Sequence, residues 1–300
     1  MIDVIIPAYN AHKTICNTLF SICMQKCVKD INVTIVDDCS LKKYDYLHEL
    51  FDDKINLNIL RLDKNSGPGK ARQYALDNTS NPYIVFIDAD DCFVNAFSVK
   101  SLIDNSKGYD IVFGNVFTER SDGALLSDNL DKRVLHGKLI KREFLNKYDI
   151  NFSGNYRGED TGFIAKILMN NAKVNYIDAD ISIYKFVSDS ITRSDSYVKD
   201  YNCLKGLVSS VLDAFLSIKD DIEPVSASYY AFLCVYNSFD LYYCDLTFDK
   251  DIILKEVKTI LEYYDKYKEY IDEDYKKIVY RIYRITDKRL EHFFNLVKNA

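Results

Sequence analysis

The chain has 300 residues, of which 48% are hydrophobic and 28% charged, as in ordinary soluble globular proteins. Its formal net charge of -6 argues against a general attraction to nucleic acid or anionic lipid, although a local basic patch could still exist. No apolar run approaches the roughly 20 residues that span a bilayer, and the opening apolar strand leaves no room for a signal peptide. We therefore expect a cytoplasmic protein with reduced cysteines, since its 8 cysteines form no C-x-x-C pair or zinc pattern.

The N-terminal part alternates between apolar strands and helices. Strands are expected at residues 2–7, 33–36, 57–62 and 83–87, with helices at about residues 12–25 and from Pro68 onward. Strands that alternate with helices are joined by right-handed crossovers and lie parallel in one sheet. The fourth strand, Tyr83-Ile84-Val85-Phe86-Ile87, is apolar throughout, which is typical of a strand buried on both faces.

Three carboxylates follow this strand directly, in the sequence Asp88-Ala89-Asp90-Asp91. They emerge at the carboxyl end of a core strand, where open α/β sheets bind their ligands. Carboxylates gathered in this way repel one another unless a cation lies among them, and a divalent ion held together with substrate phosphates would meet that need. The alternative is a turn followed by a helix N-cap, for which aspartate is equally suited.

Polar loops follow the other strands at the same edge. They are Pro7-Ala8-Tyr9-Asn10, Asp37-Asp38-Cys39-Ser40 and Asn65-Ser66-Gly67-Pro68-Gly69. The last of these loops opens a helix that carries Lys70 and Arg72, with proline in the first turn, where it is tolerated. Because the carboxyl ends of parallel strands meet at one edge, we expect these side chains to form one site.

Taken in order, these motifs resemble those of the family 2 glycosyltransferases. The resemblance continues with His136-Gly137-Lys138-Leu139, with Gly158-Glu159-Asp160 and with Tyr184-Lys185 through Ser190-Ile191-Thr192, and so covers about the first 195 residues. It implies the GT-A fold, an α/β fold with a Rossmann-like, mostly parallel sheet flanked by helices. It also implies an inverting transferase that moves a sugar from a nucleotide diphosphate, with a UDP-sugar as the expected donor, to an acceptor hydroxyl.

The resemblance implies roles for residues on the donor side. Asp90 is the first expected ligand of a divalent cation, Mn²⁺ or Mg²⁺, with Asp88 nearer the ribose and Asp91 supporting the metal cluster. Asp38 is expected to accept a hydrogen bond from the imide N–H of a uracil-like base. Arg72 is expected to reach the nucleotide or its phosphates, although from the residue alone a surface salt bridge is equally possible. Lys185 stands where the family often places Arg or His, so a phosphate there would meet a point charge without a bidentate fork. The residues expected to bind the nucleotide sugar are Pro7, Tyr9, Asn10, Asp38, Gly67, Arg72, Asp88, Ala89, Asp90 and Lys185.

The acceptor side is implied by the later motifs. Asp160 is the expected catalytic base that deprotonates the acceptor, with Glu159 as an acceptor contact and catalytic partner. His136 and Lys138 are also expected to bind the acceptor, which would be a glycan, a lipid-linked sugar or a protein. From the residues alone, Asp160 could instead be a helix cap that the helix macrodipole stabilises.

Past about Tyr197 the pattern becomes helical. Segments at about residues 197–218, 226–244, 253–267 and 274–297 show apolar residues three and four positions apart, so we expect two domains, 1–195 catalytic and 196–300 helical. Tyrosine is abundant in the second domain, where it would pack the helical core and reach water with its hydroxyl. One alternative is that these tyrosines form a platform for the acceptor. Another is that they form a subunit interface, in which case the protein would be a homo-oligomer.

Two other classes of protein compete with this interpretation. A sugar-nucleotide-forming nucleotidyltransferase should carry a glycine-rich loop with arginine after its first strand, where this chain has Pro7-Ala8-Tyr9-Asn10. A non-catalytic relative that binds glycans or partners should lack the metal carboxylates or the base, and this chain retains candidates for both.

Overall fold

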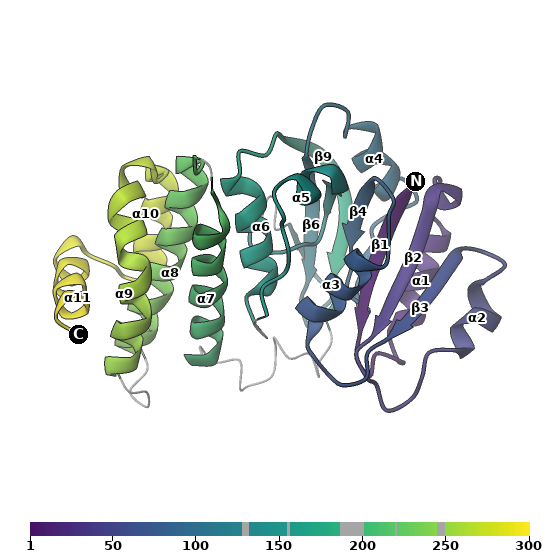
Figure 1. Ribbon diagram of the computed structural model, residues 1–300, viewed down its shortest axis with the longest axis horizontal. Coiled ribbons are helices and arrows are strands. Elements are labelled where there is room, and N and C mark those ends of the chain that lie inside the picture. The colour runs from purple at the N-terminus through teal and green to yellow at the C-terminus, as the bar shows by residue number, and fades with distance from the viewer. Residues whose placement is uncertain (128–131, 155–156, 187–200, 220, 245–249) are drawn as a thin grey trace. The chain divides into compact units, whose positions relative to one another are not determined.

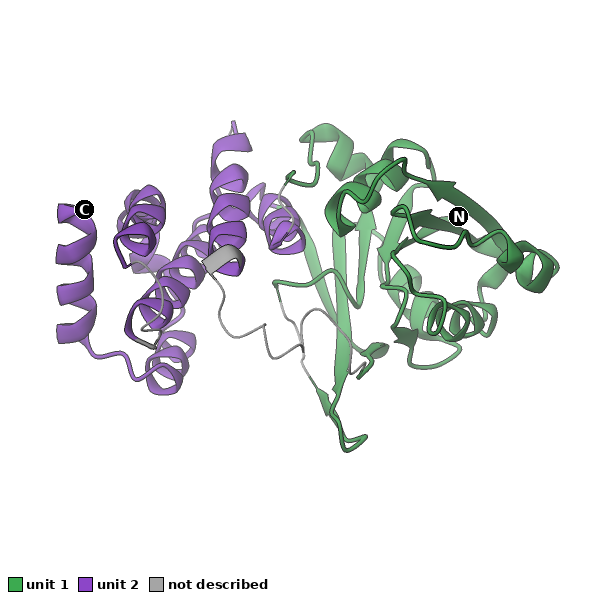
Figure 2. Cartoon of the chain, turned by 90° about the horizontal axis from the view of Figure 1, so that it is seen from below, with its two compact units in different colours: residues 1–156, 172–194 green, residues 157–171, 195–300 purple. Residues whose placement is uncertain are grey.

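The protein is described from a computed structural model, which covers residues 1–127, 132–154, 157–186, 201–219, 221–244 and 250–300. It consists of two compact units, coloured separately in Figure 2. The first comprises Met1–Tyr156 and Ala172–Ser194, and the second comprises Arg157–Asn171 and Asp195–Ala300. Residues 157–171, which the sequence analysis grouped with the N-terminal domain, therefore belong to the second unit. The motif Ser190-Ile191-Thr192 lies outside the described residues.

The first unit is built on one sheet with strand order β3-β2-β1-β4-β8-β6-β9-β5, and β7 pairs with β6. Figure 1 labels β1 to β4, β6 and β9 of this sheet. Strands β1 (Ile2–Ala8), β2 (Ile31–Asp37), β3 (Asn56–Arg61) and β4 (Tyr83–Phe86) are parallel. Helices α1 (Ile15–Cys23), α2 (Tyr46–Phe51) and α3 (Pro68–Asp77) lie between them in the sequence, with the short 3-10 helix η1 (Val28–Asp30) before β2. The expected parallel arrangement of the first four strands is confirmed, and α1 is shorter than expected.

The remainder of the sheet is mixed. Strand β8 (Lys138–Lys141) runs antiparallel between β4 and β6 (Ile111–Glu119), and β9 (Val174–Tyr184) runs parallel to β6. The short strands β5 (Cys92–Phe93) and β7 (Leu125–Ser127) pair antiparallel with β9 and β6. Helices α4 (Ser98–Asp104) and α5 (Arg142–Lys147) complete the unit. Insertion of β8 beside β4 brings the segment that precedes β8 close to the loop that follows β4.

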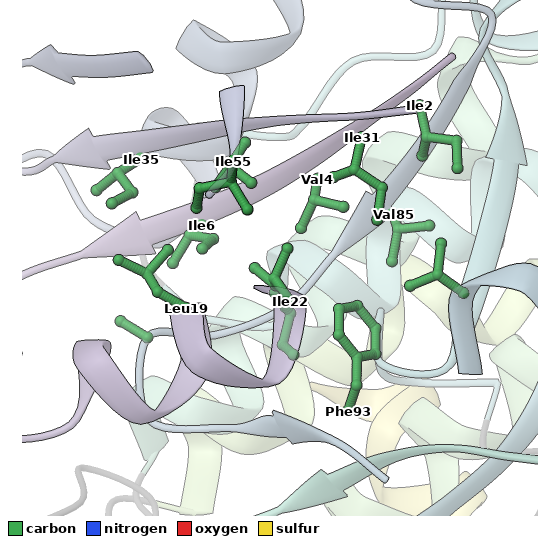
Figure 3. Close-up of a cluster of buried hydrophobic side chains, with 14 of the residues drawn as sticks. Ile2, Val4, Ile6, Leu19, Ile22, Ile31, Ile35, Ile55, Val85 and Phe93 are labelled. Atoms are coloured by element: carbon green, nitrogen blue, oxygen red, sulfur yellow. The ribbon is translucent and has the colours of Figure 1, made fainter. Parts of the chain in front are cut away.

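Alternation along β1 divides its side chains between two faces of the sheet. Ile2, Val4 and Ile6 belong to a buried cluster with Leu19 and Ile22 of α1 (Figure 3). On the other face, the buried carboxylate of Asp3 accepts hydrogen bonds from the backbone and side-chain amides of Asn81 and from the guanidinium of Arg142, at 2.7 to 2.9 Å. This network connects β1 to the start of α5 and keeps the buried charge of Asp3 paired.

Within its described residues, the second unit contains helices and no strand, as expected for the C-terminal region. It contains α6 (Glu159–Met169), α7 (Tyr201–Ser217), α8 (Pro224–Cys244), α9 (Lys250–Tyr267), the 3-10 helix η3 (Lys268–Tyr270), α10 (Glu273–Ile282) and α11 (Asp287–Asn299). Aromatic rings fill its interior, with the ring of Phe232 near those of Tyr236, Tyr264, Tyr275 and Tyr280. Among the described helices, none combines the length and the apolar character needed to cross a membrane.

The prediction of a single helical segment at residues 274–297 is wrong. The segment 274–297 forms two helices, α10 and α11, because the chain leaves the helical conformation after Ile282. Arg284 adopts a left-handed φ of 51°, and the hydroxyl of Thr286 then accepts a hydrogen bond from the backbone N–H of Arg289 at 3.3 Å. Thr286 thus caps a new helix. The spacing of apolar residues continues across this break, so the sequence pattern alone does not show where the first helix ends.

Candidate active site

The carboxylates of residues 88–91 lie in a tight turn that follows β4. The backbone N–H of Asp91 donates to the carbonyl of Asp88 at 3.1 Å, which closes the turn. Arg72 reaches this turn from α3, with its Nη2 atom 2.7 Å from Oδ1 of Asp88. Because the Arg72 side chain is almost fully buried, the ion pair is shielded from water on the arginine side. Arg72 and the acidic turn therefore lie next to each other, whereas the expected binding of the nucleotide by Arg72 stays a prediction.

His136 lies between two of these carboxylates. Its Nδ1 atom is 3.1 Å from Oδ2 of Asp91, and its Nε2 atom is 3.5 Å from Oδ2 of Asp88. Asp91 is completely buried, and its other oxygen accepts a hydrogen bond from the backbone N–H of Lys185 at 2.9 Å. Burial by itself raises the pKa of the Asp88 carboxyl, but the positive charges of Arg72 and His136 outweigh it and hold that pKa below its ordinary value.

This cluster has the donors of a divalent-cation site. Asp88, Asp91 and His136 each offer one ligand atom, and these atoms all lie within 4.8 Å of one another. Carboxylate oxygens suit Mg²⁺ and Mn²⁺, and an added imidazole nitrogen suits Mn²⁺ better than Mg²⁺. The residues present therefore fit the expected ion. Asp90, the first metal ligand expected from sequence, is half-buried in the same turn but does not belong to this group, and its role stays a prediction.

Asp38 organises the loop before α3. Its two carboxylate oxygens accept hydrogen bonds from the backbone N–H groups of Ser66 and Gly67, at 2.7 and 2.8 Å. Gly67 has a φ of 87°, a left-handed conformation that glycine adopts without strain. Each carboxylate oxygen has a second lone pair, so Asp38 can hold this loop and still accept from a ligand.

The loops after β1 and β2 are joined directly. The backbone N–H of Asn10 donates to the hydroxyl of Ser40, and the side-chain oxygen of Asn10 accepts from the N–H of Leu41, both at 2.9 Å. Tyr9 is 52% exposed beside them, and its place in a nucleotide pocket stays a prediction. These contacts bring the loops after β1 and β2 together, and Asp38 connects them to the loop that precedes α3.

The two lysines expected in the site are both engaged within the protein. Lys185 forms an ion pair with Glu119 of β6 at 2.8 Å. Lys138 is buried, and its ammonium donates to the carbonyl of His136 at 3.1 Å and lies over the ring of Phe113. Sequence reasoning missed Glu119, because nothing in its local sequence marks it and only the pairing of β6 with β9 brings it to Lys185.

The candidate base lies on a helix of the second unit. Gly158 precedes α6 with a φ of 72°, and Asp160 accepts a hydrogen bond from the backbone N–H of Thr161 through Oδ1 at 3.0 Å. A Cβ atom on Gly158 would lie 2.9 Å from the backbone of Leu207 in α7, so the glycine permits close packing of the two segments. Glu159 is buried and Asp160 half-buried, so the two acids lie in different surroundings.

Two relatives are similar to this chain in sequence. The poly(ribitol-phosphate) β-N-acetylglucosaminyltransferase TarS of Staphylococcus aureus is 27% identical over 238 residues, which is 71% of this chain and 41% of that protein. The chain thus spans about two fifths of the length of this relative. The glycosyltransferase GlyG of Streptococcus pneumoniae is 22% identical and aligns over 94% of this chain and 95% of its own.

Two solved structures share the fold. The crystal structure of S. aureus TarS 1-349 in complex with UDP-GlcNAc matches 99% of this chain and 90% of its own with a TM-score of 0.74 at 19% identity. A mannosyltransferase from Pyrobaculum calidifontis in complex with GDP-Man and Mn²⁺ matches 98% of this chain and 84% of its own with a TM-score of 0.59 at 15% identity. The expected GT-A fold with a helical C-terminal region is therefore confirmed. The family model for glycosyl transferase family 2 matches residues 3–158, more than half of the chain, and the chain belongs to that family.

Proposed function

We propose that this protein transfers a sugar from a nucleotide diphosphate, with UDP as the nucleotide, to an acceptor hydroxyl, with inversion at the sugar carbon. The observation that carries the proposal is the cluster of Asp88, Asp91, His136 and Arg72 after β4, in a chain of this family. Carboxylates and a buried arginine gathered at the carboxyl edge of parallel strands form a polar site suited to a charged ligand. The similarity to a TarS structure that holds UDP-GlcNAc supports a UDP-sugar as the donor.

The nucleotide would be held at the edge formed by the loops after β1 and β2. Asp38 has acceptor capacity left for the imide N–H of uracil, because the backbone N–H groups of Ser66 and Gly67 each use one lone pair of a different carboxylate oxygen. Tyr9 is exposed next to Pro7, as a wall of the base pocket should be. A divalent cation held by Asp88, Asp90 or Asp91 would neutralise charge that develops on the departing diphosphate. Arg72 keeps Asp88 ionised and in place for that role.

The acceptor side uses α6. In the proposed reaction, the acceptor oxygen attacks the anomeric carbon, the bond to the diphosphate breaks, and the acceptor proton passes to the Asp160 carboxylate. Glu159 would contact the acceptor. The half-buried position of Asp160 supports its role, since a base must reach its substrate. The acceptor would be a glycan, a lipid-linked sugar or a protein.

Calorimetric titration of the full chain with UDP, with and without Mn²⁺, tests the donor half of the proposal. We expect UDP binding that Mn²⁺ strengthens, and we expect Asp90→Asn and Asp91→Asn to remove most of that gain. Asp104→Asn is the matched control, because Asp104 forms an exposed ion pair with Lys100 on α4; this variant should leave binding unchanged. A screen of nucleotide sugars for slow donor hydrolysis then identifies the sugar. Absence of UDP binding under all of these conditions would contradict the proposal and favour a non-catalytic binding protein.

A further inference from the structure

A strongly basic segment lies near the C-terminus of this acidic chain. Residues 276–289 carry six lysine or arginine residues and a single acidic residue, Asp287, whereas the whole chain has a formal net charge of -6. The segment runs from the middle of α10 through the turn that follows it into the first residues of α11. Such a local excess of positive charge is not explained by the proposed glycosyl transfer.

Helix α10 turns one face to the core of the second unit and the other to solvent. On the inner face, Val279 is buried, and the rings of Tyr275 and Tyr283 contact aromatic rings of α8. On the outer face, Ile278 is 48% exposed and Ile282 is 62% exposed. The two isoleucines are four residues apart, so they lie next to each other on the surface of the helix.

Basic residues border these isoleucines. Lys277 and Arg281 are exposed and also four residues apart, which places them along the same outer face. Lys277 pairs with the exposed Asp274 at 3.0 Å. Arg281, Arg284 and Lys288 are exposed and form no ion pair with any residue that the structure describes. We call Lys277, Ile278, Arg281, Ile282, Arg284 and Lys288 the basic strip.

We propose that the basic strip binds the surface of an anionic lipid membrane, with the helix lying in the plane of the interface. Exposed apolar side chains next to cations are the combination that such helices use, because the apolar groups enter the headgroup region while the cations meet lipid phosphates. A soluble polyanion would satisfy the cations but would leave Ile278 and Ile282 in water. A second copy docked by a two-fold axis through the same strip would bring like charges together. The proposal is independent of glycosyl transfer.

Flotation of the full chain with lipid vesicles tests the proposal. We expect binding to vesicles of phosphatidylglycerol mixed with phosphatidylcholine and little binding to phosphatidylcholine alone. Binding should fall when NaCl rises from 0.1 to 1 M, because the screening length then drops from about 10 Å to about 3 Å. The triple variant Arg281→Gln, Arg284→Gln, Lys288→Gln should lower the partition coefficient on the order of 100-fold. The double variant Ile278→Ser, Ile282→Ser should lower it on the order of 10-fold.

A matched control distinguishes the effect of the basic strip on vesicle binding from the effect of the protein's net charge. The triple variant Lys205→Gln, Lys255→Gln, Lys258→Gln changes the net charge equally at exposed positions of α7 and α9, and it should bind vesicles as the wild type does. Three results would overturn the proposal: equal binding to neutral and anionic vesicles, equal losses in the two triple variants, or binding that the isoleucine substitutions leave unchanged. If the isoleucine substitutions leave vesicle binding unchanged and the protein binds soluble polyphosphate as well as it binds vesicles, the strip is a polyanion site. Self-association in sedimentation that the strip variants abolish, without vesicle binding, would instead assign the strip to a second copy.

Discussion

Gly162 offers a direct test of how α6 is held in the second unit. A Cβ atom at this position would lie 2.7 Å from Cβ of Ser210 and 2.8 Å from its carbonyl oxygen, both in α7. Carbon atoms in contact are ordinarily about 3.5–4.0 Å apart, so Gly162→Ala must push the two helices apart locally by about 1 Å. A change of side-chain rotamer cannot relieve this clash, because two of the three nearest atoms belong to the backbone of Ser210.

The magnitude follows from two opposing terms. Overpacking of this kind costs about 1–3 kcal/mol, and a clash with backbone should lie in the upper part of that range. Alanine in place of glycine inside a helix recovers about 1 kcal/mol through its higher helix propensity. We therefore expect Gly162→Ala to lower the free energy of unfolding by about 1–2 kcal/mol and the melting temperature by roughly 5 °C.

Urea unfolding followed by circular dichroism measures this change, with Gly154→Ala as the control. Apart from its neighbours in the chain, no described residue has an atom within 4 Å of the Cβ that Gly154→Ala would add, so the stability of this variant should stay within about 0.5 kcal/mol of wild type. If Gly162→Ala were as stable as the wild type, or more stable, the close packing of α6 on α7 would be refuted. Asp160 lies two residues before Gly162 on α6, so the same variant should also impair transfer more than Gly154→Ala does.

Three further predictions concern single side chains. Asp160→Asn should lower the rate of sugar transfer roughly 10²–10⁴-fold with UDP affinity unchanged, whereas Glu159→Gln should act mainly on the KM for the acceptor; steady-state kinetics and calorimetry separate the two effects. Arg142→Met leaves the buried Asp3 carboxylate without its cation, so the free energy of unfolding measured in urea should fall by about 3 kcal/mol. Burial raises the pKa of the Cys234 thiol, so iodoacetamide at pH 8 should modify Cys234 only after unfolding, as detected by mass spectrometry.

Each of these predictions has a result that contradicts it. A wild-type transfer rate for Asp160→Asn would leave that carboxylate as a helix cap only. Lys141→Met is the control for Arg142→Met, because Lys141 pairs with the exposed Glu143, and equal stability losses in the two variants would mean that burial of the pair is irrelevant. Rapid alkylation of Cys234 in the native protein would show that α8 opens readily.

The order of the elements could be predicted from sequence because its signals are local. Apolar runs, proline and glycine turns, and carboxylates at strand ends are all read within a few residues, and they correctly predict the parallel strands β1 to β4 and the position of the acidic turn after β4. The same local signals predict that the loop at residues 65–69 opens a helix that carries Arg72 next to that edge. The helical nature of the second unit was equally visible in its three- and four-residue periodicity.

Only the tertiary structure shows which distant segments contact one another. His136 contacts Asp88 and Asp91 because β8 inserts antiparallel beside β4, and its expected contact with the acceptor stays a prediction. Glu119 reaches Lys185 only because β6 pairs with β9. Local periodicity reports that a face is buried, but it does not report which distant segment covers that face. Strand pairing and helix packing are chosen by the fit of whole surfaces, so the contacts that assemble this site depend on the complete fold.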